Sequence, residues 1–194
     1  AQGLKEVGAD LLWLETLSAP EEFKAAAEAF SHLELPWVGT MSFDTAGSTM
    51  MGTSPAEMVD LIFSITNKPI AFGANCGTGA PDLLRTVQDF AKASPKNIFI
   101  AKGDAGNPKY VHGRNLYDGT RVLMAKYAVM ARNGGAKIIG GCCGTKSEHL
   151  LSMRSALENE ASGEVPSLQQ IELEIGPFSG LFRKVTKENE SKRR

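Results

Sequence analysis

The chain contains three cysteines, Cys76, Cys142 and Cys143, and the last two are adjacent. An odd number of cysteines in 194 residues does not make a disulfide framework, so these residues are expected to be free thiols or metal ligands. Free cysteines are also often buried as small apolar side chains. Composition alone does not choose between these interpretations.

The adjacent cysteines stand in the segment Gly140-Gly141-Cys142-Cys143-Gly144, at the end of an expected strand. Neighbouring side chains of an extended strand point to opposite faces, so both thiols reach one ion only if the backbone turns there. The flanking glycines permit such a turn. With Cys76 as a third thiolate, the set has the three protein ligands and the open position typical of catalytic Zn²⁺.

Three other interpretations of the cysteines remain open. A disulfide between Cys142 and Cys143 would be geometrically awkward and rare. A structural zinc site with three cysteines and one histidine would need His112 or His149, and neither has the spacing of a zinc finger. The thiols would otherwise be buried without a chemical role.

Short apolar runs typical of β-strands alternate along the chain with stretches whose apolar residues recur at helical spacing. The expected strands cover residues 10–14, 37–43, 69–73, 97–101 and 137–140. Capping boxes predict helix starts at Ser18 with Glu21, at Ser54 with Glu57 and at Thr145 with Glu148. The connection from Lys102 to Asp118 is rich in Gly, Asn, Pro and Tyr, and it is expected to be a functional loop.

This alternation predicts an α/β fold with a parallel sheet, either doubly wound or part of a (β/α)₈ barrel, and the pattern does not choose between the two. Both architectures place chemistry at the carboxyl ends of the strands. Reactive residues follow every expected strand: Glu15, Asp44, Asn75 with Cys76, Lys102 with Asp104, and Cys142 with Cys143. Together they predict a polar site at that edge of the sheet.

Composition argues against several classes of protein. The chain has 21 basic and 22 acidic residues and is 42% hydrophobic, which predicts a globular domain without a nucleic-acid-binding charge excess. No apolar run approaches the ~18 residues of a membrane span, and the first residues lack a secretory signal. We therefore expect a cytoplasmic protein with no nucleic-acid or membrane partner. The segment Gly77-Thr78-Gly79 lacks the full fingerprint of a phosphate-binding loop, so nucleotide binding is not expected.

We expect one main domain over residues 1–160 and a C-terminal extension over residues 161–194. Helical periodicity weakens after about Ser162, and the chain ends in the charge-dense segment 187–194. Such a segment is apolar-poor, so we expect the extension to be partly disordered.

The segments Gly73-Ala74-Asn75-Cys76 and Gly140-Gly141-Cys142-Cys143-Gly144 are similar to the zinc signature of the homocysteine S-methyltransferase family, and Trp13-Leu14-Glu15-Thr16 resembles its Glu-Thr segment. The resemblance covers about residues 2–157. Residues 13–30, 39–52 and 71–79 look most like bacterial betaine–homocysteine methyltransferases. The resemblance implies an incomplete (β/α)₈ TIM barrel, with about five C-terminal βα units here and the first three strands missing.

The resemblance also implies a function, which is methyl transfer, with betaine as the expected donor, to the homocysteine thiol to give methionine and dimethylglycine. Cys76, Cys142 and Cys143 would hold Zn²⁺, Glu15 would bind the homocysteine amino group, and Asn75 would shape the pocket beside the metal. Tyr110 and Tyr117 are candidates for a cage around the donor's ammonium. Alternatives are the homocysteine module of cobalamin-dependent methionine synthase and a non-catalytic, zinc-stabilised barrel fragment. Assembly into homo-oligomers is a further expectation.

Overall fold

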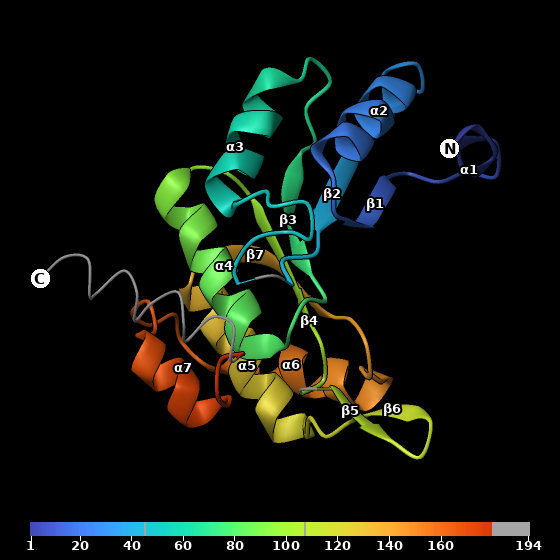
Figure 1. Ribbon diagram of the computed structural model, residues 1–194. Coiled ribbons are helices and arrows are strands. Elements are labelled where there is room, and N and C mark those ends of the chain that lie inside the picture. Colours follow the sequence, from blue (N-terminus) through green and yellow to red (C-terminus); the bar gives the residue numbers. More distant parts are fainter. Residues whose placement is uncertain (45, 107, 180–194) are drawn as a thin grey trace, which may run out of the picture.

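The computed structural model describes residues 1–44, 46–106 and 108–179. Their helices and strands are labelled in Figure 1. In chain order these elements are α1 (Gln2–Glu6), β1 (Leu12–Leu17), α2 (Pro20–Ser31), β2 (Trp37–Met41), α3 (Pro55–Ser64), β3 (Ala71–Asn75), α4 (Ala80–Ala93), β4 (Phe99–Gly103), β5 (Pro108–Val111), β6 (Arg114–Tyr117), α5 (Arg121–Asn133), β7 (Ala136–Gly141), α6 (Ser147–Asn159) and α7 (Leu168–Glu174).

Five strands form one parallel sheet in the order β1-β2-β3-β4-β7. Helices α2, α3 and α4 connect the first four strands, α5 lies between β4 and β7, and α6 follows β7. Each strand of the sheet is therefore followed along the chain by a helix. The carboxyl ends of parallel strands lie at one edge of the sheet, which is where the sequence places its reactive side chains. The predicted α/β fold with a parallel sheet is confirmed.

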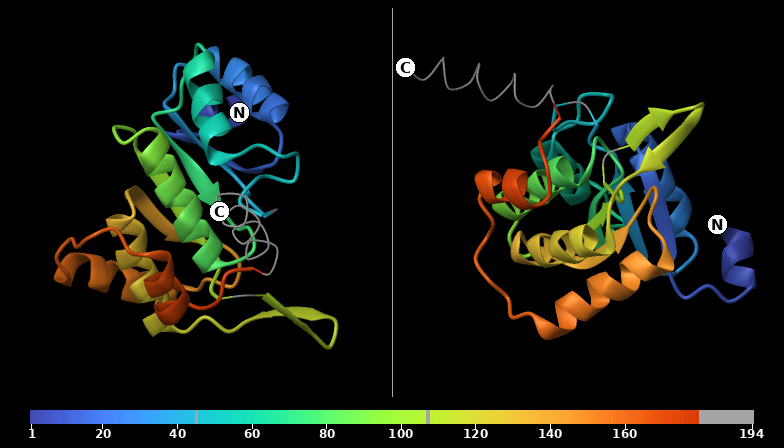
Figure 2. Two further views of the ribbon diagram at one scale, coloured as in Figure 1. Left: turned by 60° about the vertical axis from the view of Figure 1, so that its left-hand side comes forward. Right: turned by 90° about the horizontal axis from the view of Figure 1, so that it is seen from below.

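The main core lies between one face of the sheet and the helices. Its largest fully buried side chains include Phe23 from α2, Trp37 from β2, Phe90 from α4 and Tyr127 from α5. Burying an apolar side chain of this size stabilises the fold by roughly 1.5–3 kcal/mol. Figure 2 shows the helices arranged around the sheet from two further directions.

The opposite face of the sheet, which we call the inner face, carries a small apolar cluster without a helical member. Val38, Ala71 and Ile100 are its buried residues, and Ile138 packs against them. Side chains alternate between faces along a strand, so Asn75 and Lys102 share this face with Ala71 and Ile100. The inner face therefore becomes polar toward the carboxyl ends of the strands.

One of the three predicted capping boxes is confirmed. Ser54 caps α3, because its backbone N–H donates to the Glu57 carboxylate (2.7 Å) and its Oγ accepts from the Glu57 N–H (3.3 Å). The prediction for α2 was wrong by one residue, since Ala19 is the cap and Pro20 takes the first helical position, which suits a residue without an N–H. The prediction for α6 was also wrong by one residue, because Lys146 caps that helix.

The expected loop from Lys102 to Asp118 contains a β-hairpin, which the sequence analysis did not predict. Strands β5 and β6 pair antiparallel, and His112 and Gly113 form their two-residue turn with φ values of 49° and 78°. Two positive φ values are typical of a type I′ turn, whose twist matches that of the flanking strands. The hairpin extends away from the rest of the fold (Figures 1 and 2).

The C-terminal segment 160–179 packs along helices α4 and α5. Ile171 and Ile175 are buried in the main core, and the Gln88 amide donates to the Pro166 carbonyl (2.7 Å). The expected disorder of the extension falls largely on residues 180–194, which lie outside the described residues. Over the described part of the chain, no helix has both the length and the apolar character needed to cross a bilayer.

Candidate metal centre

Cys76 is held at the end of β3 by an unusual backbone conformation. Its φ is +58°, in the left-handed region that costs an ordinary residue about 1–2 kcal/mol. The Cys76 N–H donates to the Lys102 carbonyl of β4 (3.1 Å), which fixes the turn against the neighbouring strand. Strain of this kind persists where the surrounding structure imposes it, and it is often found at functional sites. Here it accompanies a thiol that faces the end of β7.

Cys142 and Cys143 lie in a turn that begins where β7 ends at Gly141. The Cys142 N–H donates to the Gly103 carbonyl (2.8 Å), and the Cys143 carbonyl accepts from the Ala105 N–H (2.9 Å). The adjacent thiols thus belong to a turn that is hydrogen-bonded to the end of β4. Because the backbone turns here and is not extended, the two adjacent thiols can both face one ion.

Asp104 follows β4 and joins the same cluster. Its side chain is buried, its Oδ1 accepts from the Cys143 N–H (3.0 Å), and its Oδ2 accepts from the Cys76 thiol (3.8 Å). The sequence analysis placed Asp104 among the polar residues that follow strands but did not include it in the metal site. Its position after β4, between the strands that carry the cysteines, was the available signal.

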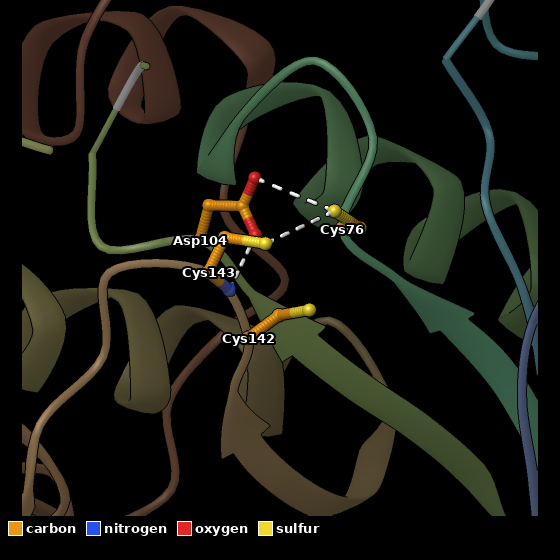
Figure 3. A group of neighbouring side chains, drawn as sticks. All are labelled: Cys76, Asp104, Cys142 and Cys143. Carbon is orange, nitrogen blue, oxygen red and sulfur yellow. Dashed lines mark hydrogen bonds between the residues drawn. The ribbon is translucent and has the colours of Figure 1, made fainter. Parts of the chain in front are cut away.

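One potential ligand atom from each of Cys76, Asp104, Cys142 and Cys143 lies within 4.8 Å of the other three (Figure 3). The Sγ atoms of Cys76 and Cys143 are 3.7 Å apart. Tetrahedral Zn²⁺ with Zn–S bonds of about 2.3 Å would place two sulfur atoms about 3.8 Å apart. The separation and the thiolate-rich donor set therefore fit a zinc ion.

The acidities of these groups reflect crowding of like charges away from water. Burial raises the pKa of the Cys76 thiol, and the negative charge of Asp104 adds to the effect. Burial likewise raises the pKa of Cys142, against a lowering by the hydrogen bond from Asn75, and burial raises the pKa of Asp104. Without a cation, the protonated forms of these thiols and of the carboxyl group are favoured. A bound cation would favour the ionised forms.

Asn75 connects the cluster to the first two strands of the sheet. It is fully buried, and its Oδ1 accepts from the Thr16 N–H (3.1 Å) and from the Thr40 hydroxyl (2.7 Å). Its Nδ2 donates to the Thr16 hydroxyl (2.7 Å) and to the Cys142 Sγ (3.6 Å). These four hydrogen bonds use the capacity of the amide, so Asn75 positions Cys142.

Glu15 lies on β1 and is not a member of the sulfur cluster. Its carboxylate forms an ion pair with the Lys102 ammonium of β4, and the Lys102 Nζ lies 5.0 Å from the centre of the Trp13 ring. A charge beside an apolar run is costly unless it is paired, and Lys102 supplies the partner. Sequence reasoning identified both residues as polar positions after strands, but it did not pair them.

The remaining candidates fall outside the cluster. Among the described residues, the group that combines the cysteines with a carboxylate includes neither Asp44 nor a histidine. The His149 Nδ1 accepts from the Lys146 N–H (3.0 Å), and His112 is at the hairpin turn.

Tyr117 packs beside the site, and its pKa is raised to about 12, first by burial and then by its hydrogen bond with Cys143. Tyr110 is 78% exposed.

Comparisons with known proteins identify a matching family and a similar fold. Residues 1–157 match the family model described as homocysteine S-methyltransferase. The fold is similar to crystal structures of the homocysteine methyltransferase MmuM from Escherichia coli, with a TM-score of 0.65 and 21% sequence identity to the apo form. That match covers 80% of this chain and 52% of the MmuM chain.

The oxidized and metallated forms of MmuM give the same TM-score and identity, with 79% of this chain covered and 48% and 47% of theirs. The chain therefore spans about half the length of the MmuM chains that it resembles. Sequence identity at this level supports the fold alone. The five parallel βα units are those of an incomplete (β/α)₈ barrel, as predicted.

Proposed function

Because the chain belongs to the homocysteine S-methyltransferase family, we propose that Cys76, Cys142 and Cys143 hold Zn²⁺ and that the protein methylates the thiol of homocysteine. The observation that carries the proposal is the convergence of three sulfur atoms from two strand ends within 4.8 Å. Zinc bound there would coordinate the substrate thiol and favour its thiolate, the nucleophilic form, at neutral pH.

The side chains around the cysteines have separate tasks in this proposal. Asn75 keeps Cys142 in place through its hydrogen bond to Sγ, and Asp104 keeps the turn at Cys143 in place through the backbone N–H. Glu15 binds the ammonium group of homocysteine, as the family resemblance implies. A substrate held at both ends presents its sulfur to the methyl donor in one orientation, and fixed orientation supplies much of the acceleration in a direct transfer.

We propose betaine as the methyl donor, on the strength of the sequence resemblance over residues 13–30, 39–52 and 71–79. The homocysteine sulfur forms a bond to a methyl carbon while the bond from that carbon to nitrogen breaks. The electron pair of the broken bond stays on nitrogen, so the products are methionine and dimethylglycine. Tyr117, which lies beside Cys143, is better placed than the exposed Tyr110 to contact the donor's ammonium.

Replacing single cysteines tests the metal site and the activity together. Cys76→Ser and Cys142→Ser each remove one thiolate, so we expect zinc content to fall from about one ion per chain to a small fraction of that. Methyl transfer to homocysteine should be lost in the same variants. Zinc is measured by atomic emission after dialysis, and methionine by mass spectrometry.

His112→Ala is the matched control, because a site with three cysteines and one histidine would need such a ligand. We expect this variant to keep its zinc. Cysteine variants that retain both zinc and activity would overturn the proposal. Measuring methyl transfer with methylcobalamin in place of betaine distinguishes the two candidate donors. A chain that binds zinc but has no affinity for homocysteine would instead have a non-catalytic role.

A further inference from the structure

Lys102 and Glu15 form an ion pair on the inner face of the sheet, close to the sulfur cluster. They are 87 residues apart in the sequence, and they approach each other from β4 and β1, with β2 and β3 between those strands. The Lys102 side chain is 21% exposed and that of Glu15 is 37% exposed. Both charged groups are therefore partly withdrawn from water and still accessible to a ligand.

The pair keeps unused hydrogen-bonding capacity. Lys102 Nζ contacts Glu15 Oε1 and lies over the Trp13 ring, which leaves the ammonium with further N–H donors and the carboxylate with its second oxygen. A cation and an anion side by side match a ligand that carries the same two charges in the opposite order. The α-amino acid zwitterion, with its ammonium and carboxylate on one carbon, is such a ligand.

The sulfur cluster lies within reach of this pair. Lys102 is the register partner of Asn75, and parallel strands are about 4.8 Å apart. Asn75 donates to Cys142 Sγ, and the Lys102 carbonyl accepts from the Cys76 N–H, so Lys102 adjoins both cysteine-bearing segments. In homocysteine two methylene groups separate the sulfur from the α-carbon that carries the ammonium and the carboxylate.

We propose that Lys102 binds the α-carboxylate of the thiol substrate while Glu15 binds its ammonium. The inference rests on the proposed function, because it takes the substrate sulfur to lie at the cysteine cluster. Lys102 is then a substrate-binding residue that selects α-amino acid thiols. When the zwitterion is bound, the Lys102 ammonium contacts the substrate carboxylate and the Glu15 carboxylate contacts the substrate ammonium. Each of the four charged groups then has an oppositely charged neighbour.

A merely structural Lys102 predicts a different pattern of binding. If the lysine only neutralises Glu15, its replacement weakens all thiol ligands together or none of them. If it binds the carboxylate, the loss appears only for ligands that carry a carboxylate. Three thiols distinguish these cases: homocysteine, aminopropanethiol, which lacks the carboxylate, and sulfanylbutanoate, which lacks the amino group.

The experiment uses the full chain loaded with Co²⁺, because thiolate binding to cobalt gives a near-ultraviolet charge-transfer absorption. Each thiol is titrated into the unaltered chain and into Lys102→Met. We expect the variant to bind homocysteine and sulfanylbutanoate about tenfold to a hundredfold more weakly. Its affinity for aminopropanethiol should be unchanged or higher, which also shows that the variant is folded and metal-bound.

Two further variants complete the test. Lys137→Met removes an exposed lysine of β7 and should leave all three affinities unchanged, which controls for net charge. Glu15→Gln should weaken homocysteine and aminopropanethiol but spare sulfanylbutanoate. Equal effects of Lys102→Met on all three thiols, or no effect, would overturn the role of Lys102. If no thiol alters the spectrum of the unaltered chain, it is the proposed function that fails.

Discussion

In the proposed zinc site, Asp104 would link the stability of the metal-free chain to its affinity for the metal. Burial raises the pKa of this carboxyl, so in the folded chain the protonated form is favoured relative to the unfolded chain. Its contribution to stability is then fully present below the ordinary aspartate pKa of about 3.9 and is lost as pH rises through the raised value. At neutral pH the ionised carboxylate opposes folding unless a cation is bound nearby.

Asp104→Asn should therefore have opposite effects on two measurements. The amide oxygen can still accept from the Cys143 N–H, but the buried charge is gone. We expect the melting temperature of the metal-free variant at neutral pH to rise by roughly 2–4 °C, the shift that about 1 kcal/mol produces in a chain of this size. Zinc affinity, measured by competition with a chromophoric chelator, should fall about tenfold.

The pH dependence supplies the control for this prediction. In acid, where Asp104 is protonated in both states, the two metal-free proteins should melt at the same temperature. A stabilisation of the variant that persists unchanged at low pH would show that the effect does not come from the charge. A variant that loses stability at neutral pH would show that the carboxylate is held mainly by its hydrogen bonds.

The turn that carries the adjacent cysteines packs closely against Tyr117 of the β5–β6 hairpin. Gly144 has a φ of +74°, and a Cβ at this position would lie 2.3 Å from Cγ of Tyr117. Gly113, in the hairpin turn, has a similar φ of +78° but no neighbouring atom within 4 Å of the added Cβ. The two glycines therefore separate backbone strain from steric contact.

Gly144→Ala should be more destabilising than Gly113→Ala. The positive φ costs each variant about 1 kcal/mol, and the clash with Tyr117 should add about 1–3 kcal/mol at position 144. Because Cys143 precedes Gly144, movement of the turn should also lower zinc affinity in that variant alone. Chemical unfolding and chelator competition measure the two effects. Equal losses in both variants would mean that the ring moves aside freely.

The elements show which parts of the fold the sequence encodes locally. The strands were predictable because each is a short, continuous apolar run, and α3 began at its predicted cap because Ser54 and Glu57 make both hydrogen bonds of a capping box. The start of α2 differed because Glu22 accepts from the Ser18 and Ala19 N–H groups. The spacing of the residues alone does not show whether the Glu21 or the Glu22 carboxylate accepts the hydrogen bonds at the start of the helix.

The hairpin and Asp104 were missed for different physical reasons. Strands β5 and β6 have four residues each, and their exposed apolar residues, such as Tyr110 and Leu116, do not mark a buried face. The dipeptide His112-Gly113 was the available turn signal. The role of Asp104 depends on burial and on contact with Cys76 and Cys143, which are distant in sequence, so the pattern could mark its position but not its partners.

At the scale of the whole molecule, the C-terminal segment 160–179 lies beyond the family match, which ends at residue 157, yet its side chains enter the main core. The buried Asp82 carboxylate of α4 accepts from the Thr78 hydroxyl and from the Ser179 N–H, both at 2.9 Å. Asp82 thus joins the loop after Cys76 to the end of the described chain. These contacts predict that the segment unfolds together with the sheet.

Two substitutions within α7 test whether the chain unfolds as one unit. Ile171 is fully buried, so Ile171→Ala should reduce the free energy of unfolding by about 2–5 kcal/mol. Leu173, in the same helix, is 83% exposed, so Leu173→Ala should change the free energy of unfolding by less than about 0.5 kcal/mol. Tryptophan fluorescence in urea reports unfolding of the sheet, because Trp13 lies on β1 and the buried Trp37 lies on β2. If α7 belongs to the cooperative unit, Ile171→Ala shifts the midpoint of this fluorescence change, since a distant loss of packing lowers the stability of the whole. An unchanged midpoint, with loss of helical circular dichroism at lower urea, would show that the segment unfolds independently and that the loop after Cys76 does not depend on it.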